Sequence, residues 1–186
     1  MDTISKAFED VDRVEFLPDE LKNQSHRDAP LPIGHGQTIS QPYTVRKMLE
    51  WLDVRRGNIV LDVGFGSGWT TALLSNIVGP KGKVYAVERI PELMKFGKLN
   101  VLRFGVRNAR FYLSKKNIIG LPERSPFNRI LVSASANNLP NELINQLAVG
   151  GKLIIPVRNN ILEVTKKANG MHEVITHPGF IFVPLV

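Results

Sequence analysis

The 186-residue sequence contains no cysteine, which excludes disulfide bridges, thiolate metal sites and a thiol nucleophile. Its four histidines include no pair at the spacing of metal ligands on a helix, so we expect no metal ion. No apolar run approaches the roughly 18 residues that a membrane-spanning helix needs. The amino-terminal residues are acidic and polar, unlike those of a signal peptide. We therefore expect a cytoplasmic protein with no membrane partner.

The rest of the composition is ordinary for a folded soluble domain, with 43% hydrophobic and 22% charged residues. The length suits a single domain, and no stretch has the composition of a linker, a low-complexity tract or an internal repeat. We expect one domain over residues 1–186, and we expect it to be a monomer.

Positive charge is concentrated in one stretch. The net charge is +7, yet residues 95–129 alone carry +8, because nine basic residues are opposed there by Glu123 alone. The nine are Lys95, Lys98, Arg103, Arg107, Arg110, Lys115, Lys116, Arg124 and Arg129. A solvated surface explains such a run, and the alternative is a nucleic-acid or acidic partner. Basic residues interleaved with aromatic ones, which would favour RNA, are not seen.

A glycine-rich turn follows a β-branched apolar run at the centre of the sequence. Ile59–Val63 has the character of a strand buried on both faces, and Gly64, Gly66 and Gly68 come directly after it. Glycine permits a positive φ and lets a ligand approach the backbone closely. A helical pattern begins at Trp69, and the free N–H groups of its first turn favour an anionic or polar ligand. This order predicts a nucleotide-type cofactor site.

The spacing of the glycines narrows the choice of cofactor. Trp69 stands where the dinucleotide fingerprint G-x-G-x-x-G has its third glycine, so the pattern here is G-x-G-x-G. With Asp62 two residues before it, this pattern resembles the first motif of class I methyltransferases, which bind S-adenosylmethionine. Such enzymes carry a ribose-binding carboxylate at the end of the next strand, and Glu88 ends the run Lys83–Glu88.

Strand and helix patterns alternate along the rest of the chain. We expect strands at 59–63, 83–88, 109–113, 129–133 and 152–157, and helices at 69–78, 91–104 and 140–147. Asn169-Gly170 favours a hairpin turn between two closing strands. The alternation predicts an α/β fold: a doubly wound, mostly parallel, Rossmann-like methyltransferase sheet with helices on both faces and a C-terminal antiparallel hairpin.

The amino-terminal third contains two helices separated by a long loop. Residues 2–12 and the stretch after Pro42 have helical patterns, the second with Val45, Met48, Leu49 and Leu52 as its apolar stripe. Residues 23–40 have the composition of a loop, and loops of this length are often functional. Ser40 or Gln41 is the expected cap of the second helix. We expect residues 1–57 to cover the site, 58–157 to bind the cofactor and 158–186 to form the closing strands.

The loop and the segments after it resemble one family in particular. Pro30–Tyr43 resembles the signature of the protein-L-isoaspartate O-methyltransferases. The resemblance continues in order through Leu61–Gly68, Val84–Leu93, Arg129–Ala136, Gly150–Val157 and Phe182–Leu185. It implies methylation, with S-adenosylmethionine as the cofactor, of the carboxylate of L-isoaspartyl residues in damaged proteins. A carboxylate with a pKa near ~4 is already ionised at neutral pH, so this chemistry needs no general base.

The same resemblance implies roles for particular residues. Ser40 is the implied catalytic residue, with its hydroxyl directed toward the incoming carboxylate. The implied cofactor-binding residues are Thr38, Ile39, Asp62, Gly64, Phe65, Gly66, Ser67, Gly68, Glu88, Arg89, Ser114 and Lys115. The implied substrate-binding residues are Ile33, His35, Ser133, Ala134 and Ser135.

One segment departs from the family pattern. Ser114-Lys115-Lys116 stands where the family carries Gly-Asp-Gly, whose aspartate accepts a hydrogen bond from the adenine amino group. Lysine has donors and no acceptor, so Lys115 cannot replace that aspartate. Two alternatives follow from this departure: a cofactor-poor relative that acts as a binding module, and a methyltransferase of the same fold that acts on RNA or a small molecule.

Overall fold

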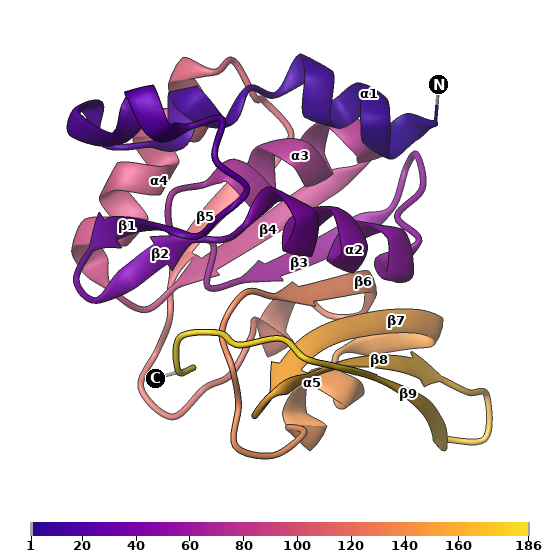
Figure 1. The fold of residues 1–186 in the computed structure, drawn as a ribbon. Coiled ribbons are helices and arrows are strands. Elements are labelled where there is room, and N and C mark those ends of the chain that lie inside the picture. Colours follow the sequence, from indigo (N-terminus) through magenta and orange to yellow (C-terminus); the bar gives the residue numbers. More distant parts are fainter. Residues whose placement is uncertain (1, 186) are drawn as a thin grey trace.

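The computed structural model describes residues 2–185, and its main element is a seven-stranded sheet of order β5-β4-β3-β6-β7-β8-β9 (Figure 1). Strands β3 to β7 pair in parallel, and β8 and β9 continue the sheet as antiparallel neighbours. The strands are β3 (Ile59–Val63), β4 (Lys83–Glu88), β5 (Ala109–Leu113), β6 (Phe127–Val132), β7 (Leu147–Val157), β8 (Asn160–Lys166) and β9 (His172–Pro178). The predicted fold class, including the C-terminal hairpin, is confirmed.

Helices cover the two faces of the sheet unequally. The α-helices are α1 (Thr3–Asp10), α2 (Pro42–Leu52), α3 (Trp69–Val78), α4 (Pro91–Arg103) and α5 (Asn141–Asn145). The short 3-10 helices are η1 (Arg13–Phe16), η2 (Asp19–Gln24) and η3 (Pro122–Arg124). Residues of α1 to α4 belong to one buried cluster, and residues of α5 to a second cluster beneath the other face. The face with four helices is therefore the thicker layer.

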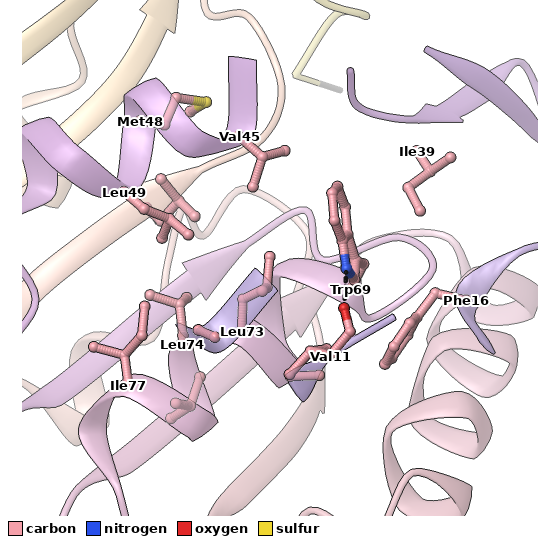
Figure 2. Packing of buried hydrophobic residues seen from close by; sticks show 14 of the residues in the cluster. Val11, Phe16, Ile39, Val45, Met48, Leu49, Trp69, Leu73, Leu74 and Ile77 are labelled. Carbon is pink, nitrogen blue, oxygen red and sulfur yellow. Dashed lines mark hydrogen bonds between the residues drawn. The ribbon is translucent and has the colours of Figure 1, made fainter. Parts of the chain in front are cut away.

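The larger cluster joins the amino-terminal segments to α3 (Figure 2). Trp69, at the start of α3, is 2% exposed and donates its indole N–H to the carbonyl oxygen of Val11 over 3.2 Å. The predicted apolar stripe of α2 is confirmed, because Val45, Met48, Leu49 and Leu52 are all buried. The amino-terminal segment thus packs against the helix that begins at the glycine loop.

The segment before α2 differs from the loop predicted for residues 23–40. It contains a small antiparallel hairpin, separate from the main sheet, of β1 (Leu31–Gly34) and β2 (Gln37–Ile39). His35 lies at the turn with a φ of 54°, between two glycines that also have positive φ. The glycines that gave this stretch the composition of a loop form the turn of a hairpin.

The expected cap of α2 was also wrong. The N-cap residue Gln41 forms no side-chain cap, and Asp28 supplies one from outside the helix. Its Oδ1 accepts a hydrogen bond from Tyr43 N over 2.9 Å, while its Oδ2 accepts one from Gln41 Nε2 over 3.1 Å. The chain folds back at the hairpin and brings Asp28 to this position, so the Ser40 hydroxyl is not the group that caps α2.

Two further boundaries shift near the end of the parallel sheet. Helix α5 ends at Asn145 and β7 begins at Leu147, whereas the sequence predicted a helix to 147 and a strand from 152. Leu147 pairs with Phe127 across an irregularity in the β6–β7 register, which extends the strand backward.

Among residues 2–185, no helix combines the length and the apolar character needed to span a membrane.

Candidate active site

A hollow of about 910 Å³, open to solvent, lies where β3, β4 and β6 end. Parallel strands place ligands at their carboxyl ends, so the position is the expected one. Its walls come from the β1–β2 hairpin, the glycine loop, the loop after β5 and the carboxyl-terminal tail. Ser135 holds that tail, since its N–H donates to Val183 O over 2.7 Å and its carbonyl accepts from Leu185 N over 2.8 Å.

The glycine loop packs directly against α4. Gly68 has a φ of +90°, and a Cβ there would meet Val101 and the carbonyl oxygen of Gly97. A Cβ on Gly97 would overlap the carbonyl oxygen of Gly66 in turn. These two positions accept no side chain, and the close contact fixes the loop against the helix that follows Glu88.

The Glu88 carboxylate is oriented by three backbone amides. Its Oε2 accepts from Gly66 N over 3.0 Å, and its Oε1 accepts from Arg89 N over 2.7 Å and Ile90 N over 3.0 Å. The side chain is 7% exposed and contributes to the pocket wall. A carboxylate has about four acceptor sites, so it keeps capacity for a hydroxyl donor from a ligand.

Asp62 lies behind the wall rather than in it. It is fully buried, and its Oδ2 accepts hydrogen bonds from the hydroxyls of Thr70 (2.9 Å) and Thr71 (2.7 Å). Among the described residues its Oδ1 has no partner. Burial raises the pKa of Asp62 to about 6, because the charged form loses its hydration. Thr70 is part of the pocket wall, so Asp62 is connected to the pocket by its hydrogen bond with this threonine.

The loop after β5 forms the wall that departs from the family pattern. Ser114, Ile118, Ile119 and Gly120 line the pocket. The Lys115 ammonium group points elsewhere and pairs with the exposed Glu123 carboxylate over 3.4 Å.

Gln146, which is 4% exposed, holds the far end of this loop. Its Oε1 accepts from Leu121 N over 2.7 Å, and its Nε2 donates to Ile119 O over 2.8 Å. The wall is therefore apolar and fixed from behind by a buried amide, and a lysine does not enter it.

Most of the residues predicted for the site line this one pocket. They are Ile33, Thr38, Ile39, Ser40, Gly64, Phe65, Gly66, Ser67, Glu88, Arg89, Ser114, Ser133 and Ala134. Five predicted residues are not part of its lining: His35, Asp62, Gly68, Lys115 and Ser135. His35 instead lines a separate groove between the hairpin, η2 and α4.

The sequence interpretation missed the wall residues Gln37, Val63, Trp69, Thr70, Val87, Ile90, Leu93, Ile118, Ile119, Gly120, Val183, Pro184 and Leu185. Ile118 and Ile119 had a signal, because an apolar pair just after a strand end lies at the ligand edge of a parallel sheet. Phe182–Leu185 in the tail belongs to the family resemblance, but its place beside the pocket depends on how the chain folds back after β9.

The lining fits S-adenosylmethionine in kind. Glu88 offers an acceptor for hydroxyl groups, the glycine loop offers close backbone contact, and Ile90, Ile118 and Ile119 offer apolar surface for a ring.

Comparison with known proteins identifies the family of this chain. The family model described as protein-L-isoaspartate(D-aspartate) O-methyltransferase matches residues 1–186. The chain belongs to this family. A protein-L-isoaspartate O-methyltransferase of Pyrococcus horikoshii is 45% identical over 98% of this chain and 84% of its own length. The enzyme of that name from Methanothrix thermoacetophila is 44% identical over 98% of this chain and 87% of its own length.

A solved structure of the same family has the same fold. The beta-aspartate methyltransferase (PCMT) of Plasmodium falciparum, crystallised with S-adenosyl-L-homocysteine, superposes with a TM-score of 0.88 at 28% identity. The match covers 100% of this chain and 91% of the other. S-adenosyl-L-homocysteine is the product left when S-adenosylmethionine has given up its methyl group, so that structure holds the demethylated form of the cofactor predicted here.

Proposed function

We propose that this chain transfers a methyl group from S-adenosylmethionine to the carboxylate of L-isoaspartyl residues in damaged proteins. The observation that carries the proposal is one pocket that holds Ser40, the glycine loop and Glu88 together, in a chain that matches the family over its whole length. The cofactor, when bound, supplies an electrophilic methyl group on a positively charged sulfur.

Each wall has a separate role in this proposal. Glu88 accepts hydrogen bonds from the ribose hydroxyls, and the apolar wall of Ile118 and Ile119 contacts the adenine ring. Ser40 donates its hydroxyl to the substrate carboxylate and holds it in line with the methyl group. The carboxylate arrives ionised, so no residue has to remove a proton. Orientation of this kind contributes up to about 7–11 kcal/mol in well-aligned systems.

The loop after β5 supports a conventional cofactor site despite its departure from the family pattern. Lys115 is exposed and directed to Glu123, so it places no positive charge beside the adenine. The chain still lacks the aspartate that accepts from the adenine amino group in the family, so the methyl-transfer test decides against or for the binding-module alternative. Eight of the nine basic residues of the 95–129 stretch are exposed, which agrees with a solvated surface.

The test is methyl transfer from labelled S-adenosylmethionine to an isoaspartyl peptide and to the otherwise identical aspartyl peptide. We expect labelling of the isoaspartyl peptide alone. Equal labelling of both peptides, or labelling of RNA in their place, would contradict the proposal.

The Ser40→Ala variant sharpens the same test. Because Ser40 orients the reacting carboxylate in this proposal, we expect its loss to lower kcat by up to about 10²-fold, the cost of a misplacement of about 1 Å. Because Asp28 rather than Ser40 caps α2, we expect the free energy of unfolding to change by less than about 0.5 kcal/mol. Ser75→Ala, at a buried serine of α3 outside the pocket, is the matched control, and an equal loss of kcat in that variant would remove Ser40 from its role.

A further inference from the structure

Arg13 has a buried guanidinium group whose two terminal nitrogens are bound by backbone carbonyls, while its Nε has no partner among the described residues. It lies in η1 and is 5% exposed. Its Nη1 donates to the carbonyl oxygens of Arg27 (2.9 Å) and Ser25 (3.3 Å). Its Nη2 donates to the carbonyl oxygens of Ala29 (2.8 Å), Ser40 (3.1 Å) and Ile39 (3.5 Å).

The charge of Arg13 is kept and its geometry is rigid. Burial lowers the pKa of Arg13 to about 10, so the group stays protonated at neutral pH. Asp28, the acid that acts on it, has both carboxylate oxygens occupied by Tyr43 N and Gln41 Nε2. A planar guanidinium donates in fixed directions, so it specifies where each of its carbonyl partners must lie.

The five partners come from the two chain segments that flank the hairpin. Residues 25–29 lead into β1, and Ile39 and Ser40 lead out of β2. Ile39 and Ser40 also line the pocket, so the group that fixes their backbone lies directly behind the wall. The Trp69 ring, another part of that wall, lies 5.6 Å from the guanidinium carbon.

We propose that Arg13 is the positioning residue for Ser40. By binding both flanks of the hairpin, Arg13 holds the Ser40 hydroxyl in the position from which it donates to the substrate carboxylate. This inference rests on the proposed function for the role of Ser40. The predicted site residues all lay in or beside the pocket, whereas Arg13 acts from the amino-terminal segment, well before the family signature begins.

The test compares Arg13→Lys and Arg13→Met with the unchanged chain. Lysine keeps the positive charge but has no planar fork, so we expect kcat for the isoaspartyl peptide to fall at least tenfold in both variants. The dissociation constant for S-adenosylmethionine, measured by calorimetry, should change by less than threefold. A role limited to global folding would lower the apparent kcat and the fraction of chains that bind S-adenosylmethionine by the same factor. A lower kcat with an unchanged binding stoichiometry and affinity therefore identifies positioning.

Hydrogen exchange gives a second readout that does not depend on activity. We expect the amides of residues 26–29 and 37–41 to exchange at least tenfold faster in Arg13→Lys, with little change in β3 and β4. If the unchanged chain fails to methylate the peptide, the proposed function fails, and exchange still decides whether Arg13 fixes the segment. Unaltered exchange in a folded Arg13→Lys would overturn the proposal.

Arg46→Met is the matched control. Arg46 also anchors the amino-terminal segment, through Ser5 Oγ at 3.1 Å and the Phe8 ring at 4.6 Å, but it binds neither Ile39 nor Ser40. We expect a similar loss of thermal stability and an unchanged kcat in the folded fraction. An equal fall in kcat for Arg46→Met would overturn a specific role for Arg13.

Discussion

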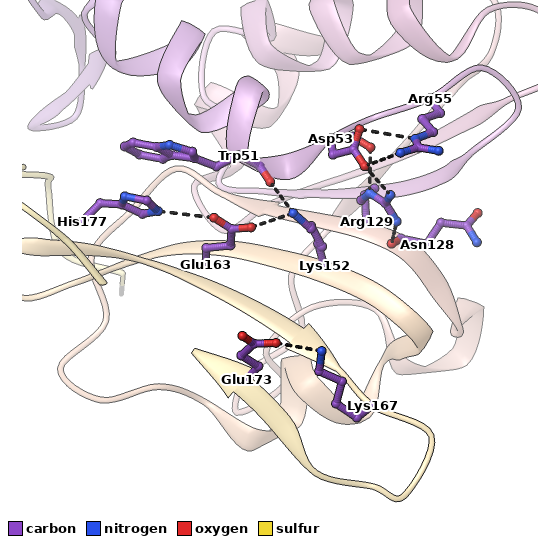
Figure 3. Close-up of polar contacts among 10 residues, drawn as sticks. All are labelled: Trp51, Asp53, Arg55, Asn128, Arg129, Lys152, Glu163, Lys167, Glu173 and His177. Carbon is purple, nitrogen blue, oxygen red and sulfur yellow. Dashed lines mark hydrogen bonds and ion pairs between the residues drawn. The ribbon is translucent and has the colours of Figure 1, made fainter. Parts of the chain in front are cut away.

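Charged side chains are bound in different ways on the two sides of the molecule. Beside the pocket, Arg13 is bound by carbonyls, Asp62 by two hydroxyls and Glu88 by backbone amides. Under the far end of α2, charges pair with opposite charges: Lys152 contacts Glu163 at 2.6 Å, and Arg129 contacts Asp53 at 3.5 Å (Figure 3).

Charges beside the pocket remain available to a ligand, whereas charges on the far side stabilise the packing of the fold. A charge held by neutral groups keeps its field, so Glu88 still presents negative charge to a cationic cofactor. A charge held by its opposite is neutralised and contributes mainly to packing. The far-side cluster connects α2 to the antiparallel strands, since Lys152 Nζ also donates to Trp51 O and the Trp51 ring stacks on His177 at 3.7 Å. Three variants test this division.

The largest effect on stability is expected on the far side, for Glu163→Ala. Removal of this mostly buried carboxylate leaves Lys152 without its acidic partner and His177 without its Glu163 contact. We expect the free energy of unfolding to fall by about 3 kcal/mol, measured by urea denaturation. The kcat of the folded enzyme should not change. Lys152→Met in the same chain should recover part of the lost unfolding free energy. A fall in the kcat of the folded Glu163→Ala variant would contradict the division between the two groups of charges.

The second largest effect is a dependence of the unfolding free energy on pH, which arises from Asp62 beside the pocket. The pKa of Asp62 in the folded chain is about 6, above its ordinary value of 3.8. Its contribution to stability is therefore complete below pH ~4 and is lost as the pH rises through about 6. We expect Asp62→Asn to remove about 2 kcal/mol of the difference in unfolding free energy between pH 4.5 and 7.5. If the unfolding free energies of the two proteins depended on pH in the same way, ionisation of Asp62 would cost the folded chain no stability.

The smallest effect on stability is expected at the amino end of α2, for Asp28→Ala. Loss of an N-cap costs about 1 kcal/mol, and here the cap also fixes Gln41. We expect a loss of that size together with a lower kcat, because Ser40 directly precedes the helix start that Asp28 orders. Asp53→Ala at the other end of α2 is the control, and it should change stability without changing kcat.

The parallel core could be predicted from the sequence because its signals are local. β3, the glycine loop, α3 and β4 follow one another within 30 residues, from Ile59 to Glu88, and each has its own pattern. Gly64–Ser67 and Glu88 were predicted as site residues for the same reason, whereas the wall residues Val63, Trp69, Thr70 and Val87 were missed. A buried strand, a glycine turn and a terminal carboxylate need no knowledge of distant contacts.

The conformation of the segment around the β1–β2 hairpin could not be predicted from local patterns, because contacts with residues distant in the sequence determine it. Asp28 reaches α2 after the chain reverses at His35, and Arg13 reaches Ser40 across 27 residues. Lys115 illustrates the opposite error. Its position in the sequence suggested contact with adenine, but the path of the chain directs it to Glu123 instead. Local pattern shows which residues are candidates, and side-chain direction depends on the folded backbone.

The amides that hold Glu88 have a consequence for binding kinetics. Because Gly66, Arg89 and Ile90 already fix the carboxylate, an arriving nucleoside need not order a freely rotating side chain. The entropy of immobilisation is lost during folding rather than at the encounter, which favours tight association without rearrangement of this corner. Free and occupied forms should therefore superpose closely at this corner of the pocket.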